Sequence, residues 1–367
     1  MFFKQLHFNA FLLIGPMGLL LIFLEIYAQK RKKQKRITIN EVITNINCGI
    51  FAHSWRILIY LILMPLYSFL YVHFSIFKIP LNPYTFILGF VIFDFVYYVM
   101  HRLSHNNEIL WIGHSVHHQS TVFDFSGACR QGLFAPLLTF PFYMTLALIG
   151  FDVKTFLLVA SVNAGLQFLE HTELFNNLGI LDKVFMAPKN HRIHHSTNIA
   201  DSNKNYGGVF LIWDICFRTS ADPNVKVNAY GLDKPFVTNS VLYANVFPVM
   251  EFVTNIFSKF FPLNKNLSVE PLKADPNKSN NQRANVRTSS YKWIQYYCLI
   301  QFIILFNFSV HFLLTVGNLD LSKIILSILI ISLGNFSMGY IISNKKYAVL
   351  IDIVRLCISI PIAINFI

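Results

Sequence analysis

Long apolar runs constrain the fold of this chain more than any other feature of its sequence. A stretch of about 18 or more apolar residues is long enough to cross the hydrocarbon core of a membrane as a helix. Of the 367 residues, 54% are hydrophobic and only 13% are charged, whereas soluble domains carry about 25% charged residues. One soluble core could not bury this much apolar surface. The sequence therefore predicts an all-α, polytopic integral membrane protein.

Eight apolar runs are predicted to span the membrane, and more polar segments separate them. The runs cover residues 8–27, 57–74, 84–100, 133–151, 153–169, 293–316, 323–342 and 347–366. The mixed segment 245–261 is predicted to be an amphipathic helix on the membrane surface. Residues 264–290, rich in Asn, Ser, Lys and Arg, are typical of a linker.

These patterns divide the chain into four regions. We predict N-terminal transmembrane helices (1–83), a histidine-rich catalytic region (84–220), a cytosolic or interfacial linker (221–292) and C-terminal transmembrane helices (293–367).

The basic residues indicate how the chain is oriented. The sequence KRKKQKR at 30–36 directly follows the first run, and cytosolic loops of membrane proteins carry an excess of Lys and Arg. The first span is therefore predicted to end in the cytosol. Two hairpins, one near Pro80 and Pro83 and one through GFDVK at 150–154, return the chain to that side, which predicts a cytosolic histidine-rich cap. Because most of the net charge of +12 lies in loops beside apolar runs, we attribute it to membrane orientation and expect no nucleic-acid partner.

Nine of the 13 histidines lie between residues 101 and 195, in three clusters and one isolated position. They are His101, His105, His114, His117, His118, His171, His191, His194 and His195. Residues at i, i+3 and i+4 share one face of a helix, so each cluster directs two or three imidazoles toward one point. Eight or nine nitrogens are enough for two metal ions. The isolated His7, His53, His73 and His311 are predicted to be structural.

The donor set narrows the choice of metal. Imidazole nitrogens suit iron, zinc, copper or nickel. The five cysteines are scattered without a C-x-x-C, which argues against a disulfide framework or a thiolate site. Carboxylate-bridged di-iron bundles use Glu-x-x-His pairs, which this sequence lacks. The segment 101–118 is too polar for a bis-histidine haem site inside a span. Among the metals that suit imidazole ligands, we favour a histidine-rich di-iron centre.

The histidine boxes resemble those of the membrane fatty acid hydroxylase and sterol desaturase superfamily, most closely its alkylglycerol monooxygenase branch. The stretches that carry the resemblance are DFVYYVMHRLSH, WIGHSVHH, LEHTELFNN, APKNHRIHH and NKNYGGVFLIWDICF, within about residues 85–220. The resemblance implies a di-iron enzyme that uses O2 to attack a C–H bond of a lipid. It also implies that the eight box histidines are iron ligands and that His171 is a ninth.

Asp94 is the candidate catalytic residue outside the ligand set. It precedes His101 by seven residues and so lies on nearly the same helix face. We expect its carboxyl group either to hold a ligand histidine from behind or to pair with Arg102 or a tyrosine hydroxyl. The segment 203–217 is predicted to support the cytosolic cap.

Two positions depart from the pattern of the alkylglycerol branch. Asn106 stands where relatives usually carry Glu, with Glu108 two residues further on, which weakens the inference of tetrahydrobiopterin as the reductant. Phe217-Arg218-Thr219 replaces the Phe-Gly-Thr of the family, so the turn there is in question.

The leading hypothesis is a membrane monooxygenase that hydroxylates a lipid, with cleavage of an alkylglycerol ether as one outcome. A sterol or fatty acyl desaturase is the alternative within the superfamily. A histidine-rich metal transporter is an alternative of another class, but transporter sites lie near the bilayer midplane and these boxes lie at span ends. No GxGxxG or C-x-x-C-H occurs, so an electron donor protein or a diffusible reductant is expected. The predicted membrane is the endoplasmic reticulum or a bacterial inner membrane.

Overall fold

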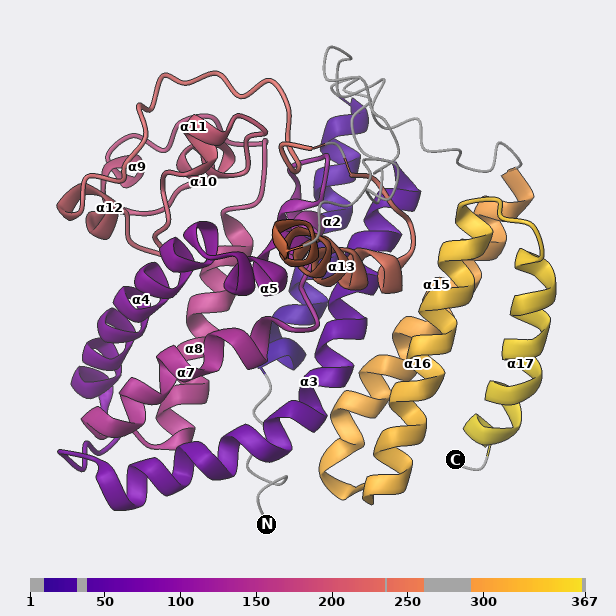
Figure 1. The fold of residues 1–367 in the computed structure, drawn as a ribbon, viewed down its shortest axis with the longest axis horizontal. Coiled ribbons are helices and arrows are strands. Elements are labelled where there is room, and N and C mark those ends of the chain that lie inside the picture. The colour runs from indigo at the N-terminus through magenta and orange to yellow at the C-terminus, as the bar shows by residue number, and fades with distance from the viewer. Residues whose placement is uncertain (1–9, 32–37, 235, 261–291, 365–367) are drawn as a thin grey trace.

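The computed structural model describes residues 10–31, 38–234, 236–260 and 292–364, and helices dominate these ranges (Figure 1). Beyond two isolated bridges, Phe185 to Phe210 and Ser196 to Tyr230, the described residues contain no β-strand. The prediction of an all-α fold is therefore confirmed. His7, most of the basic run and the linker at 264–290 lie outside the described residues.

The helices fall into long apolar elements of at least 15 residues and shorter elements of at most 11 residues. The long ones are α2 (Ala10–Arg31), α3 (Ile39–Phe74), α4 (Pro83–Asn106), α7 (Ala135–Ile149), α8 (Val153–Leu169), α13 (Val241–Phe260), α15 (Lys292–Thr315), α16 (Leu321–Ile342) and α17 (Ala348–Ile364). The shorter ones are α5 (Glu108–His118), α6 (Phe125–Ala128), α9 (Leu181–Val184), α10 (Pro188–His194), α11 (Ile199–Ser202), α12 (Ile212–Cys216) and the 3₁₀ turn η2 (Val316–Asn318).

Five helices among the described residues are long and apolar enough to cross a membrane by length and composition. Four of them contain the predicted runs 57–74, 84–100, 293–316 and 323–342. The runs 133–151 and 153–169 form the shorter helices α7 and α8, while the first and last predicted runs extend beyond the described residues. An integral membrane protein is thus supported, and the count of eight spans remains a prediction.

The fifth long apolar helix is α13, which was expected on the membrane surface. By length and composition Val241–Lys259 also qualifies as a span. Figure 1 shows α13 end-on, whereas α15, α16 and α17 run within the plane of the view. The helix therefore crosses the direction of the C-terminal helices, an orientation that fits a surface helix better than a span.

Helix α3 is longer than its apolar run. Thr38 caps it by accepting a hydrogen bond from the backbone N–H of Glu41, and the helix then continues for 36 residues. Its first half carries buried polar residues, including Asn45 and Asn47, which pack inside the protein. The apolar pattern alone could not reveal this half, because tertiary contacts and not lipid surround it. Pro65 lies in the second half, and the helix changes direction along its length (Figure 1).

Turns with clear sequence signals join the helices of the histidine-rich region. Asn82 caps α4 in a reciprocal capping box with Thr85, and Pro83 is the first residue of the helix. Gly150 ends α7 with a φ of 130°, a conformation that favours glycine, and Asp152 caps α8. Both predicted connections are therefore confirmed as helix-to-helix turns.

The two largest of four apolar clusters among the described residues hold most of the helices together. One joins α3, α4, α7 and α8 through residues such as Tyr67, Phe93 and Phe156. The other joins α2 and α3 to α15 and α16 through residues such as Ile46 and Ile328. The first core fixes the two helices, α4 and α8, whose ends carry histidines.

A largely buried ion pair connects the C-terminal helices. The Arg355 guanidinium lies 2.7 Å from the Asp352 carboxyl group on α17, as their spacing predicts. Asp352 also accepts hydrogen bonds from Tyr297 on α15 and Ser337 on α16. The pair therefore ties three helices to one another.

Candidate metal centre

Four elements carry the nine clustered histidines to one end of the bundle formed by α3, α4, α7 and α8. His101 and His105 occupy the last two turns of α4, and α5 carries the second box. His171 follows the end of α8, and α10 with its C-cap carries the third box. The cap elements α9 to α12 lie over this end of α4 and α8 (Figure 1).

The nine histidines form two groups. The first box belongs to one group, whereas the second and third boxes each contribute to both. The five-histidine group contains His101, His105, His114, His118 and His194. The four-histidine group contains His117, His171, His191 and His195. Within each group one ring nitrogen per histidine lies within 4.8 Å of all the others. The expected convergence on two sites is therefore present in the geometry.

The division of each box follows from helix geometry. Residues at i and i+4 are about 40° apart around a helix, whereas adjacent residues are about 100° apart. His114 and His118 accordingly share one group, while His117 turns toward the other. His191 and His195 share a group in the same way, and His194 turns away from them.

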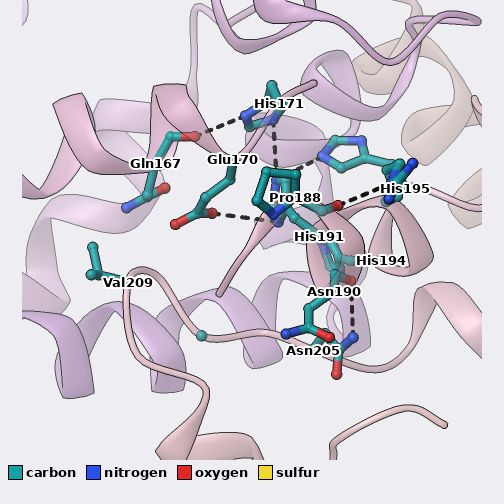
Figure 2. Close-up of polar contacts among 12 residues, drawn as sticks. Gln167, Glu170, His171, Pro188, Asn190, His191, His194, His195, Asn205 and Val209 are labelled. Carbon is teal, nitrogen blue, oxygen red and sulfur yellow. Dashed lines mark hydrogen bonds and ion pairs between the residues drawn. The ribbon is translucent and has the colours of Figure 1, made fainter. Parts of the chain in front are cut away.

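The Nε2 atoms face inward in both groups. Nε2 of His114 lies 2.8 Å from that of His101 and 3.0 Å from that of His118. Nε2 of His171 lies 3.1 Å from that of His117. It is also 3.1 Å from that of His191 (Figure 2). Nε2 of His195 is likewise 3.1 Å from that of His191.

The outer ring nitrogens are held by backbone carbonyl groups. Nδ1 of His101 and His194 donate to the carbonyls of Tyr206 (2.8 Å) and Lys204 (2.9 Å). A carbonyl only accepts, so these rings carry their proton on Nδ1 and present the Nε2 lone pair inward.

The four-histidine group has the same kind of support. Nδ1 of His117 donates to the carbonyl of Arg130 at 3.0 Å, and Nδ1 of His171 donates to that of Gln167 at 2.9 Å (Figure 2). This arrangement is typical of histidines that bind a metal through Nε2.

Burial keeps the rings neutral. It lowers the pKa of His117 and of His194 to about 4. The pKa values of His114, His118, His171, His191 and His195 lie well below 6.5, first because of burial and then because of the neighbouring imidazoles. A neutral imidazole is the form that binds a metal.

Aromatic side chains enclose the groups, a role that the sequence analysis did not assign to them. The ring of Phe123 stacks on His171 at 5.4 Å and on Tyr230 at 5.3 Å, which covers the four-histidine group. Trp111 and Tyr206 lie against His105, with ring centroids 5.0 and 5.4 Å away. Trp111 and Tyr206 lie in stretches that carry the family resemblance, whereas nothing in the sequence distinguishes Phe123 from the many other aromatics in the chain.

Asp94 does not hold a histidine. Among the described residues, its carboxyl group accepts hydrogen bonds from Asn163 (2.8 Å), from the indole of Trp213 (2.9 Å) and from two backbone N–H groups, at 209 (2.7 Å) and 210 (3.1 Å). Neither Arg102 nor a tyrosine hydroxyl is among these partners. Seven residues of helix separate Asp94 from His101 by about 10 Å along the axis, so the carboxyl group reaches the loop below the rings.

A second buried carboxyl group holds the same loop. Asp214 accepts from the backbone N–H groups of Tyr206 (2.9 Å) and Gly207 (2.7 Å). Tyr206 in turn supplies the carbonyl that holds His101, so residues 203–217 support the histidines themselves. The loop carries the outer contacts of the five-histidine group.

The two departures from the family pattern are both accommodated. Arg218 adopts a φ of 56°, in the left-handed region that favours glycine, so the turn forms with the larger residue. Asn106 donates to the carbonyl of Arg102 at 2.7 Å, and Glu108 forms an exposed ion pair with Lys259.

The isolated histidines that the structure describes lie apart from both groups. His311 and His73 are exposed on their helices, and the ring of His73 lies tilted against that of Phe69, with the ring centroids 4.7 Å apart. His53 is half-buried in α3. His171, in contrast, belongs to the four-histidine group, as its position after the fifth run suggested.

Comparison with known proteins gives this geometry a family. Residues 86–219 match the family described as fatty acid hydroxylase. Human alkylglycerol monooxygenase is 27% identical over 86% of this chain and 74% of its own length, and the Danio rerio protein of the same name is 28% identical over 90% and 76%. The ornithine lipid hydroxylase OlsE of Rhizobium tropici is 33% identical over 37% of this chain and 42% of its own.

No solved structure matches the chain significantly. The relatives are monooxygenases and hydroxylases, and the predicted resemblance is confirmed. The chain therefore carries a fatty acid hydroxylase domain in residues 86–219 and is an oxygenase enzyme.

Proposed function

We propose that this chain is a membrane-bound di-iron oxygenase that hydroxylates a C–H bond of a lipid. The observation that carries the proposal is the pair of histidine groups inside a fatty acid hydroxylase domain. The relatives named alkylglycerol monooxygenase favour a lipid with a long alkyl chain, and an alkylglycerol ether is the first candidate.

The donor atoms fit two iron ions. Nε2 of His105 and Nε2 of His194 are buried without a hydrogen-bond partner among the described residues, which is costly unless a ligand binds there. All nine proposed donors are imidazoles, a set that suits iron, although zinc binds the same atoms more tightly than ferrous iron. Bound iron would supply the redox chemistry that O2 activation needs.

The protein side chains position the reaction and exclude water. The nine histidines hold the ions, and Phe123, Trp111 and Tyr206 enclose them. Asp94 acts as a positioning residue, because it fixes the loop that holds His101.

The reaction consumes O2, two electrons and two protons for each C–H bond, and it yields an alcohol and water. The electrons come from a donor protein or a diffusible reductant. When the hydroxylated carbon adjoins an ether oxygen, the product is a hemiacetal that separates into an aldehyde and an alcohol.

The membrane arrangement is part of the proposal. Lys30 and Arg31 end α2 on the same side of the molecule as the cap elements α10 and α11 (Figure 1). By the bias of basic residues toward the cytosol, this side is cytosolic. We retain the eight spans, the four regions of the chain and a location in the endoplasmic reticulum or a bacterial inner membrane.

Oxygen-isotope labelling tests the proposal. Membranes that contain the chain are supplied with labelled O2, a reductant and an alkylglycerol lipid, and products are identified by mass spectrometry. A hydroxylase gives a product, or its aldehyde fragment, that carries one labelled oxygen. A product that is two hydrogens lighter and unlabelled identifies a desaturase instead. Membranes with His101→Ala provide the control.

A further inference from the structure

The outer contact of His191 differs from those of its neighbours. Four other histidines of the two groups donate through Nδ1 to backbone carbonyls. Nδ1 of His191 instead faces the carboxyl group of Glu170, whose Oε2 lies 3.7 Å away (Figure 2). Among the described residues this is the one histidine of either group whose Nδ1 faces a carboxyl group within 4 Å.

The two facing atoms are both buried and both lack another partner. Glu170 is 5% exposed and His191 is 3% exposed. Oε2 of Glu170 and Nδ1 of His191 have no hydrogen bond among the described residues. An unsatisfied buried polar group costs about 1–3 kcal/mol. Closing the gap by about 0.5 Å, from 3.7 Å to 3.2 Å, would satisfy both atoms with one hydrogen bond.

Glu170 is placed to act on one group only. It is the C-cap residue of α8, directly before His171, and the same helix end supplies the Gln167 carbonyl that holds His171. The end of α8 is therefore followed by one member of the four-histidine group, His171, and it also supplies the groups that face the outer nitrogens of His171 and His191. The five-histidine group receives its outer contacts from residues 204 and 206.

We propose that Glu170 is a positioning residue of the four-histidine group, which accepts a hydrogen bond from Nδ1 of His191 and so directs Nε2 of that ring inward. The proposal rests on the proposed function, in that the group holds a metal ion. A carboxyl group behind a ligating imidazole fixes its tautomer and orientation and strengthens the metal bond, and losing such a partner costs about 10–100-fold in metal affinity.

Cobalt titration of the metal-free, full-length protein in detergent tests the proposal, because each bound Co²⁺ can be followed by its absorption spectrum. The wild-type protein is expected to bind two ions. Glu170→Met has a similar length but no hydrogen-bond acceptor of comparable strength. It should lower the affinity for one of the two ions by about 10–100-fold and change the absorption spectrum of that ion, while the binding and spectrum of the other ion stay unchanged. Glu170→Gln keeps an accepting oxygen and should recover most of the affinity.

The matched control is Glu173→Gln. Glu173 lies three residues away on the same segment, but its carboxyl group accepts from the Tyr230 hydroxyl at 2.6 Å. This variant should bind both ions as the wild type does.

The outcomes separate the two proposals. Unchanged binding of both ions by Glu170→Met overturns the role of Glu170, and so does an equal loss in Glu170→Met and Glu170→Gln. If Glu170→Met does not fold, Glu170→Asp decides: its carboxyl group is withdrawn by one methylene, and unchanged affinity for both ions overturns the proposal. Failure of the wild-type protein to bind two ions contradicts the di-metal function itself.

Discussion

The two histidine groups are built from shared helices but are supported by different parts of the chain. The five-histidine group depends on the loop at 203–217, which two carboxyl groups, Asp94 and Asp214, hold in place. The four-histidine group depends on the end of α8 and on Phe123. A single histidine box therefore does not define a single site, because its histidines belong to different groups and different parts of the chain hold those groups in place.

Removal of one ligand should have the largest effect and should differ between the groups. His171→Ala leaves three histidines in its group, whereas His105→Ala leaves four in the other. We expect His171→Ala to lose one metal ion and all turnover, and His105→Ala to retain more metal. Metal content per chain after iron reconstitution measures this.

The control for that comparison is His311→Ala, since His311 lies exposed on α15 away from both groups. It should keep metal and activity. Equal metal content and activity in His171→Ala and His311→Ala would remove His171 from the ligand set.

Acid should destabilise the metal-free protein through both groups together. Burial depresses the pKa of His117 and His194 to about 4, below the ordinary value of 6.5. The unfolded chain therefore binds more protons than the folded one between these values. The stability that the neutral rings contribute is present above about pH 6.5 and is lost as the pH falls toward 4.

Thermal unfolding of the metal-free protein at a series of pH values tests this expectation. The melting temperature should fall steadily from pH 7 to pH 5, and bound metal should reduce the dependence. A melting temperature that is constant over this range would contradict buried, neutral histidines.

Asp94→Ala should weaken metal binding by the five-histidine group more than by the four-histidine group. The change strands four hydrogen-bond donors and should lower the free energy of unfolding by on the order of 3 kcal/mol. Because the loop at 203–217 holds His101, the ion of the five-histidine group should be lost first. Thermal unfolding and cobalt spectra report the two effects.

Asp352→Ala is a matched control, because Asp352 is also a buried carboxyl group with several donors. It should cost comparable stability without any change in metal binding. If both variants lose metal alike, the effect of Asp94 is general destabilisation and not support of one group.

Arg218→Gly should have the smallest effect, and a favourable one. A residue with a side chain costs about 1–2 kcal/mol in the left-handed region, where Arg218 lies. Glycine should recover part of this cost and raise the melting temperature slightly, without changing metal content. A lower melting temperature would indicate that the Arg218 side chain makes a contact worth more than the strain.

The histidines and the helical membrane fold could be predicted because both depend on local periodicity. Apolar runs give helices, and i, i+3, i+4 spacing places imidazoles on one face. The supports could not be predicted in the same way. Backbone carbonyls such as those of Tyr206 and Gln167 carry no sequence signal, and Glu170 meets His191 only through the tertiary fold. Asp94 was singled out because it shares a helix face with His101, but its distance along α4 gave it different partners from those expected.

Two pairs of adjacent histidines, His117–His118 on α5 and His194–His195 at the end of α10, link the two groups. The ring centroids of His117 and His118 are 5.6 Å apart, and those of His194 and His195 are 5.5 Å apart, with the rings nearly perpendicular in both pairs. In each pair one peptide bond joins a member of one group to a member of the other. The separation of the two groups is therefore constrained twice by covalent geometry, so any displacement of one group must carry adjacent histidines of the other group with it.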